Sequence, residues 1–230
     1  MSYNYSQYVS DLAVLLVVPS NDPNFMAILP NIIDDAEQRI YRELNLLGTV
    51  VRDTSANLTP NNRTFALPMS AGRFNTVTGV NVITPVGSTT TTGTRNPLQP
   101  TWRAMLDFLF PLETASGTSV PSKFAMISDQ TIIVGPPPDA SYNVEVIGTI
   151  RPTPLSASNS TTYLTQYLPD LFIDASMVFA SGYQQNFSAA SDNPQQGQHW
   201  ESQYQAHMAS ASAEEMRRKY NQDVEARARP

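Results

Sequence analysis

The spacing of apolar residues changes twice along the chain, and this change limits the possible folds more than any other feature of the sequence. Between residues 25 and 47, apolar side chains recur every three or four positions, as they do along one face of an α-helix. From residue 49 they form short alternating or β-branched runs between Pro, Gly and Asn, which favours strands. Helical spacing returns in the last third of the chain. The sequence therefore predicts an α+β protein.

The N-terminal part is predicted to form two helices. The first covers residues 3–18 and is stopped by Pro19. The second ends at Gly48, and Pro30 either kinks it or occupies its first turn, because Pro cannot donate a backbone N–H. The face opposite the apolar stripe of this second helix is polar, and it carries Asp34, Asp35, Glu37, Arg39, Arg42 and Glu43.

The C-terminal part is predicted to form two further helices. One opens at Tyr167 with the sequence YLPD, and the other opens with Asp192 as its N-cap and Pro194 in its first turn. The second of these is long and ends in residues 214–229, where acids and bases alternate with few apolar residues. We expect this tail to be solvated on its own or to bind a partner.

The β region is predicted to contain five strands that form a small antiparallel sandwich or barrel. They cover residues 63–67, 73–86, 123–127, 131–134 and 143–150. A Thr-rich loop at residues 88–94 is expected to be mobile, and residues 102–110 are expected to form one or two helical turns.

These patterns divide the chain into two predicted domains. Both chain ends, residues 1–48 and 156–230, are expected to form a helical bundle. Residues 49–155 are expected to form an inserted antiparallel β-sandwich or barrel domain.

Charge is scarce and unevenly distributed. Only 15% of the residues are charged, against about 25% in a typical soluble domain. Residues 51–155 carry six acids and seven bases, whereas the two ends carry fourteen acids and seven bases. With two Lys, the chain has too little cationic surface to displace counterions from phosphates, so tight DNA or RNA binding is disfavoured. An acidic wall past which DNA slides is compatible with this composition.

Motifs for catalysis or cofactor binding are missing from the sequence. Without Cys there are no disulfides, thiolate nucleophiles or sulfur-ligated zinc sites. His199 and His207 are expected to be surface or interface residues of one helix, about 12 Å apart, which is too far to share a metal ion. Residues 117–123 (GTSVPSK) lack the second Gly of a phosphate-binding loop. We therefore predict no enzyme activity, catalytic residue, cofactor or metal site.

Neither a secretory nor a membrane-spanning segment is expected. The first basic residue is Arg39, and the apolar run at residues 12–18 is too short to span a bilayer. We expect synthesis in the cytoplasm and no membrane contact.

Three stretches resemble the head-to-tail adaptor, or connector, proteins of tailed bacteriophages. They are residues 35–44 (DAEQRIYREL), residues 128–139 (SDQTIIVGPPPD) running into Tyr142 and Val144, and residues 167–171 (YLPDL). The tail tubular protein A of short-tailed phages is similar in this layout. The resemblance covers most of the chain in its organisation.

This resemblance implies a structural virion protein of the neck, where the head meets the tail. In the family, a helical bundle from both chain ends carries an inserted β domain, and copies form a ring, usually of twelve, beneath the portal protein. The ring joins the capsid to the tail and its nozzle, and it conducts DNA during ejection without binding it specifically. The C-terminal helix and tail reach the portal, so the candidate portal-interface residues are Met216, Arg217, Arg218, Lys219 and Tyr220. The acidic helical regions are where we expect the channel wall.

Two other functions stay open on the sequence alone. A tail or baseplate component could use the Thr-rich β domain to bind carbohydrate or another virion protein. A cell-wall hydrolase could assemble a carboxylate pair from distant parts of the chain. Neighbouring acids do not offer such a pair, because Asp34 and Asp35 point in different directions on a helix, and Glu214 and Glu215 are expected to be solvated.

Overall fold

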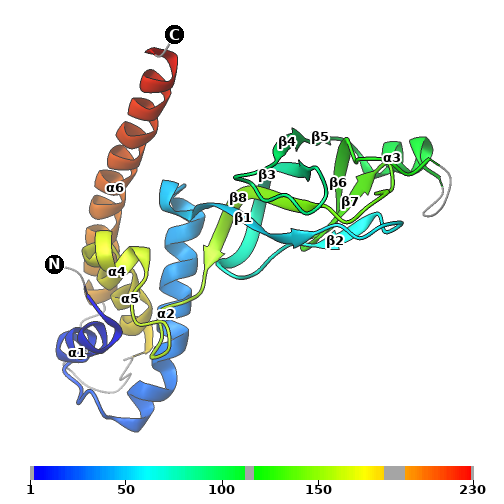
Figure 1. The fold of residues 1–230 in the computed structure, drawn as a ribbon. Helices are drawn as coiled ribbons and strands as arrows, with labels where there is room; N and C mark the ends of the chain where they lie inside the picture. The colour runs from blue at the N-terminus through cyan, green and yellow to red at the C-terminus, as the bar shows by residue number, and fades with distance from the viewer. Residues whose placement is uncertain (1–2, 112–116, 184–194, 229–230) are drawn as a thin grey trace. The chain divides into compact units, whose positions relative to one another are not determined.

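The computed structural model of this 230-residue chain describes residues 3–111, 117–183 and 195–228. The chain divides into two compact units, one made of residues 1–48 and 153–230 and the other of residues 49–152. We call them the helical unit and the β unit. Figure 1 shows helices in the first and mainly strands in the second. The α+β class predicted from the sequence is confirmed.

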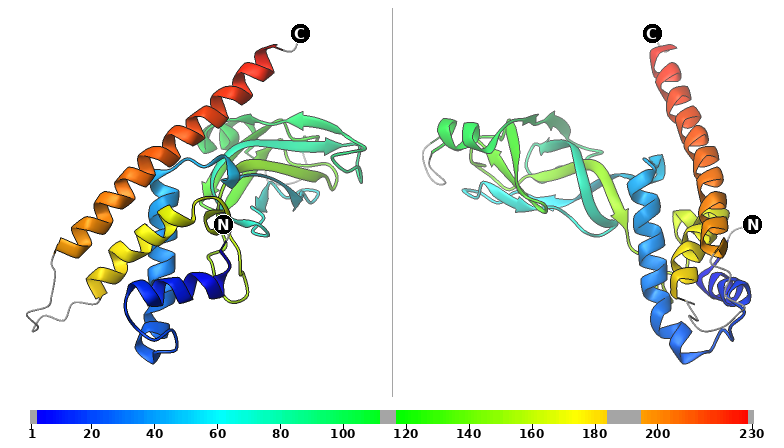
Figure 2. Two further views of the ribbon diagram at one scale, coloured as in Figure 1. Left: turned by 90° about the vertical axis from the view of Figure 1, so that its left-hand side faces the viewer. Right: turned by 180° about the vertical axis from the view of Figure 1, so that it is seen from behind.

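In the helical unit, segments from both chain ends share one core. The described helices are α1 (Tyr5–Leu15), α2 (Pro23–Glu43), α4 (Tyr163–Tyr167), α5 (Pro169–Tyr183) and α6 (Gln195–Ala228). Helix α5 packs against both α2 and α6, and Figure 2 shows these three helices side by side. Leu29 of α2 is fully buried together with Phe172 of α5 and Tyr204 of α6. Tyr8 of α1 stacks on Phe172, with ring centroids 4.5 Å apart.

Polar caps determine where the two N-terminal helices begin. Asn4 caps α1 and Asp22 caps α2, each by accepting a 2.9 Å hydrogen bond from a backbone N–H three residues further on. Pro23 occupies the first turn of α2, whereas Pro30 lies inside the helix, so the alternative that α2 begins at Pro30 is wrong. Helix α1 is shorter than predicted and ends at Leu15.

The C-terminal part differs from the prediction at its first helix. Helix α4 ends at Tyr167, where the prediction begins a helix, and α5 begins at Pro169. The break has a simple cause, because Pro169 lacks the backbone N–H that would continue α4. The carbonyl of Thr165 accepts instead from the backbone N–H of Tyr3 (2.9 Å).

Two four-stranded sheets enclose the core of the β unit. The first has the order β1 (Val50–Asn57), β8 (Asn143–Pro152), β3 (Gly72–Thr84) and β4 (Thr94–Pro97). The second has the order β2 (Thr64–Ala66), β7 (Thr131–Gly135), β6 (Lys123–Ser128) and β5 (Gln99–Pro100). The described pairings are antiparallel except that of β5 with β6. Val146 of the first sheet and Ile132 of the second share the core, which makes the unit a sandwich, as predicted.

The five predicted strands are found as β2, β3, β6, β7 and β8, whereas β1, β4 and β5 were not predicted. Strand β1 has the polar sequence VVRDTSAN and pairs with β8 through a bulge between Asp53 and Ala56. The Thr-rich segment forms the turn between β3 and β4, where the N–H of Gly93 donates to the carbonyl of Thr89 (2.9 Å). Helix α3 (Arg103–Leu109) lies where one or two helical turns were predicted.

Candidate functional site

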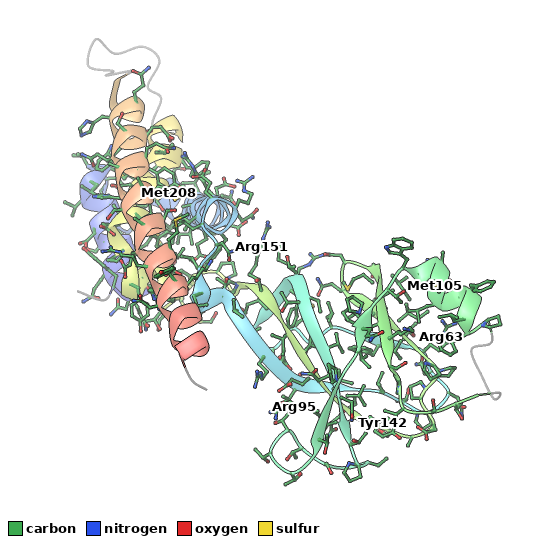
Figure 3. All side chains as sticks on the ribbon, turned by 90° about the horizontal axis from the view of Figure 1, so that it is seen from above. Arg63, Arg95, Met105, Tyr142, Arg151 and Met208 are labelled. Atoms are coloured by element: carbon green, nitrogen blue, oxygen red, sulfur yellow. The ribbon has the colours of Figure 1, made fainter. Side chains whose placement is uncertain are left out.

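The C-terminal helix α6 carries the candidate site, and one of its faces is built into the helical unit. The helix is described from Gln195, and the cap predicted at Asp192 and Pro194 lies outside the described residues. Its buried stripe has helical spacing and consists of Tyr204, Met208, Ala211 and Glu215. Figure 3 shows Met208 on this helix among the side chains of its neighbours.

Arg39 of α2 fastens the middle of α6. Its two terminal nitrogens donate to the carboxylate of Glu201 at 2.8 and 2.6 Å, and its guanidinium carbon lies 4.0 Å from the ring centre of Tyr204. The hydroxyl of Tyr204 donates back to Glu43 on α2 (2.9 Å). The hydrogen bonds from Arg39 lower the pKa of Glu201, so this carboxylate is ionised at neutral pH and the pair is retained.

The two histidines lie on α6, and one of them joins it to α5. His207 Nδ1 lies 2.5 Å from Oδ2 of Asp174, and burial raises the pKa of that carboxyl although His207 opposes the rise. His199 Nε2 lies 2.9 Å from the side-chain nitrogen of Gln203 on the same helix. Among the residues that the structure describes, no group of three or more His, Asp or Glu could hold a metal ion.

Near its C-terminal end, α6 is fastened to the segment that follows α2. The buried carboxylate of Glu215 accepts hydrogen bonds from the backbone N–H of Leu47 (2.9 Å) and the hydroxyl of Tyr163 (3.2 Å). Lys219 Nζ donates to the carbonyl of Asn45 (2.6 Å). The prediction that Glu215 is solvated is therefore wrong, because its place on the helix faces two hydrogen-bond donors that belong to distant parts of the sequence.

The five residues predicted to contact a portal are divided between two faces of α6. Arg218 donates to the buried carboxylate of Glu215 (2.6 Å), and Lys219 donates to the carbonyl of Asn45. These two side chains therefore lie on the side of α6 that faces the rest of the helical unit. Met216 and Tyr220 are 70% and 69% exposed, and their four-residue spacing places them side by side on the opposite face. Arg217 is exposed as well. We call Met216, Arg217 and Tyr220 the outer α6 face.

Glu37 is a buried carboxylate that was predicted on the polar face of α2, and that prediction is wrong. It accepts a hydrogen bond from the backbone N–H of Leu155 (3.1 Å), where the chain returns to the helical unit. Burial raises the pKa of Glu37 to about 7, the Leu155 N–H opposes this rise, and the charge of Asp34 adds to it. The sequence did indicate that Glu37 is buried, because this residue lies between Ile33 and Ile40 at the spacing of the buried stripe.

Comparison with protein families adds a match over nearly the whole chain. Residues 3–229 match the SU10 adaptor protein family. The chain belongs to this family. SU10 adaptor proteins are phage head-to-tail adaptors, so the resemblance seen in the sequence is confirmed. The protein is therefore a structural component of the virion neck that assembles with other virion proteins.

Membership in the SU10 adaptor family also limits the functions open on the sequence alone. The family is structural and is not a class of enzymes. A search of curated proteins finds no match to the chain. Along the described ranges, no helix combines the length and the apolar character needed to cross a membrane.

Proposed function

We propose that copies of this adaptor form a ring beneath the portal, with twelve members as the family resemblance implies. The ring joins the capsid to the tail and nozzle and conducts DNA between them. The outer α6 face is the portal-docking surface in this proposal. The proposal includes no catalytic, cofactor or metal-binding role, and it places synthesis of the chain in the host cytoplasm.

One observation supports the docking surface above the others. Met216 and Tyr220 expose large side chains on a helix whose opposite face is already occupied by the subunit's own core. Methionine and tyrosine are enriched in protein interfaces, and a few such residues contribute most of the affinity. A partner that covers them removes apolar surface from water without disturbing the packed face of the helix.

The contacts behind this face support the same assignment. Arg39 holds the middle of α6, and the contacts of Glu215 and Lys219 hold the part that precedes Tyr220. A docking face on a fixed helix loses little conformational entropy when a partner binds. The outer α6 face is thus ordered before it meets a portal.

Charge supports the assignment of the helical unit to the channel wall. This unit, residues 1–48 and 153–230, contains fourteen acids and seven bases, whereas residues 49–152 contain six acids and seven bases. A net negative surface repels the phosphates of passing DNA and keeps the duplex from binding to the wall. We therefore assign the channel wall to the helical unit.

The docking proposal is tested by measuring the affinity of the purified adaptor for the portal protein of the same phage. The double variant Met216→Ser, Tyr220→Ser is expected to weaken binding by about 30-fold or more, as loss of an interface hot spot does. Both side chains are exposed, so the variant is expected to keep its melting temperature. Unchanged affinity would remove the outer α6 face from the proposal.

A matched control is available in the β unit. Met69 is 63% exposed, so Met69→Ser makes the same chemical change at similar exposure and is expected to leave portal affinity unchanged. Deleting residues 214–230 is a less specific test, because it also removes Glu215 and Lys219 and with them the contacts to Leu47 and Asn45.

A further inference from the structure

Two short segments join the helical unit to the β unit. Residues 44–49 lead from α2 into β1, and we call them the outgoing connection. Residues 153–162 lead from β8 back to α4, and we call them the return connection. In each connection, a backbone N–H donates to a buried glutamate of the helical unit. A carboxylate therefore anchors the chain where it leaves the helical unit and where it returns.

The two anchoring glutamates belong to different helices. Glu215 of α6 accepts from Leu47 in the outgoing connection (2.9 Å), and Glu37 of α2 accepts from Leu155 in the return connection (3.1 Å). A buried polar group that loses its hydrogen bond costs free energy, so each bond restrains its connection. The helix with the proposed docking face thus anchors one connection, and α2 anchors the other.

The contacts of α6 with the outgoing connection extend over more than one helical turn. Lys219 Nζ donates to the carbonyl of Asn45 (2.6 Å), one turn beyond Glu215. Tyr163 donates to Glu215 (3.2 Å), and a side chain at Gly48 would come within 2.5 Å of the Tyr163 ring, so this close approach requires glycine. These contacts require α6 to be helical as far as residue 219.

The same turns of α6 carry the outer α6 face. Met216 and Tyr220 each follow directly after a residue that contacts the outgoing connection, so the exposed pair and the contacting pair lie on different sides of the same turns. Unwinding of this part of α6 would therefore remove the docking face and the contacts with the outgoing connection together. A helix end with one packed side opens more readily than a core helix.

We infer that the outer α6 face and the outgoing connection are coupled through the helical state of residues 215–220. The contacts of Glu215 and Lys219 stabilise the helix that presents the outer face. By thermodynamic linkage, a partner bound to that face stabilises the same contacts in return. Portal docking is therefore expected to hold the outgoing connection more firmly and to leave the return connection unchanged. The coupling rests on the proposed function for the identity of the partner.

Hydrogen exchange in the free adaptor tests the coupling without a portal. Arg217 lies on the outer α6 face, and its side chain donates to the carbonyl of Ala213 in its own helix (3.3 Å). Arg217→Gly is expected to speed exchange of the Leu47 amide by about fivefold, because glycine disfavours a helix interior. Arg217→Ala, the matched control, removes the same side chain but favours the helix, so it is expected not to speed this exchange. The Leu155 amide is expected to keep its wild-type rate in both variants.

Two results in the free adaptor would overturn the coupling. Equal exchange of the Leu47 amide in Arg217→Gly and Arg217→Ala would show that the outgoing connection does not depend on the helical state of α6. Equal acceleration at Leu47 and Leu155 would show a loss of overall stability instead of a link to one connection.

A second test uses the complex with the portal protein of the same phage. Saturating portal is expected to slow exchange of the Leu47 amide by about tenfold or more, because a partner that binds the helical state suppresses its opening. The double variant Glu215→Ala, Lys219→Ala removes the contacts that transmit this effect, so the portal is expected to leave its Leu47 exchange unchanged. Docking on the outer α6 face without slower exchange at Leu47, or a slowing that survives the double variant, would overturn the coupling.

Failure of the docking proposal gives a different pattern. If the portal binds elsewhere, Met216→Ser, Tyr220→Ser leaves portal affinity unchanged, whereas Arg217→Gly and Arg217→Ala still differ in the free adaptor. The comparison of these two Arg217 variants therefore decides the coupling whether or not the portal docks on α6, and it does not depend on the folding of the double variant.

Discussion

Two buried glutamates, Glu37 in the helical unit and Glu145 in the β unit, differ in how their charges are compensated. In the helical unit, Glu37 accepts a backbone hydrogen bond and lies near another acid, and burial raises its pKa to about 7. In the β unit, Glu145 of β8 lies 3.4 Å from Arg52 and 3.1 Å from Arg95 and accepts from Asn81 (2.7 Å). Burial opposes ionisation there too, but these groups outweigh it and lower the pKa of Glu145.

The two glutamates differ because the cations of the two units contact different groups. The β unit places two arginines around one buried acid within a single sheet. In the helical unit, Arg39, Arg218 and Lys219 hold α6 in place. Among the residues that the structure describes, no cation is a hydrogen-bond partner of Glu37. We conclude that the helical unit accepts a poorly compensated acid at Glu37 while its cations hold α6 in place.

Removing Arg39, which holds the middle of α6 against α2, is expected to have the largest effect on stability. Arg39→Ala loses the two hydrogen bonds to Glu201 and the contact over Tyr204, and it leaves a partly buried carboxylate unpaired. Because Glu201 is partly exposed and water screens the pair, we expect the free energy of unfolding to fall by about 2 kcal/mol, measured by urea denaturation. Arg73→Ala in the β unit breaks an exposed pair with Asp129 and is expected to cause no measurable loss. Equal losses from both variants would contradict the comparison.

Glu37→Gln tests the poorly compensated acid. A folded-state pKa above the unfolded value means that the folded state holds the extra proton, so stability falls as pH rises from about 4.5 to 7. Glu37→Gln has no charge to bury, so it does not lose stability as pH rises. Its amide oxygen can still accept the hydrogen bond from the backbone N–H of Leu155. We expect it to be more stable than the wild type by about 2 kcal/mol at pH 8 and similar to it at pH 5. A difference that is the same at both pH values would show that Glu37 acts through packing.

Glu145→Gln is expected to have the opposite effect. Because the folded-state pKa of Glu145 is lowered, its ionised form adds stability above the unfolded pKa, and this stability is lost as pH falls through the folded value. The variant is expected to unfold more easily than the wild type by about 1 kcal/mol at pH 7. The difference in unfolding free energy between the variant and the wild type should narrow as the pH approaches 3. Thermal unfolding over that pH range measures it, and a gap that widens on acidification would contradict the assignment.

Val17→Gly is the smallest expected change and concerns strain that lies outside the core. Glycine relieves the left-handed backbone at the end of α1, and we expect a gain of up to about 1 kcal/mol in unfolding free energy. Val14→Gly is the matched control, because the same change inside the helix is expected to cost about 1 kcal/mol. Calorimetric melting of both variants measures the difference. A loss at both positions would contradict the assignment of backbone strain to Val17.

Local patterns were enough to predict much of the fold. Apolar spacing revealed α2 and the buried side of α6, and alternation revealed the central strands β3 and β8. Strand β1 was not predicted, because its sequence is polar and it becomes a strand through pairing with β8, almost a hundred residues away. Strand pairing over that distance leaves no trace in local spacing.

The candidate site was predictable only in part. The segment 216–220 was singled out correctly as lying on a helix. Its division into an outward and an inward face depends on Glu215, whose hydrogen-bond partners include Leu47 and Tyr163 from distant parts of the chain. Buried acids such as Glu37 and Glu215 look like surface residues in a sequence, because the N–H and O–H groups that satisfy them come from distant segments. Their burial is a tertiary property.

The most direct test of the docking proposal is the protection of a single cysteine on the outer α6 face. Met216→Cys introduces the chain's one thiol at an exposed position, and its rate of maleimide labelling is measured with and without saturating portal protein. We expect labelling to slow by at least tenfold when the portal is bound, while Met69→Cys in the β unit keeps its rate. Equal labelling of Met216→Cys in the free and portal-bound adaptor would contradict the claim that this face docks the portal.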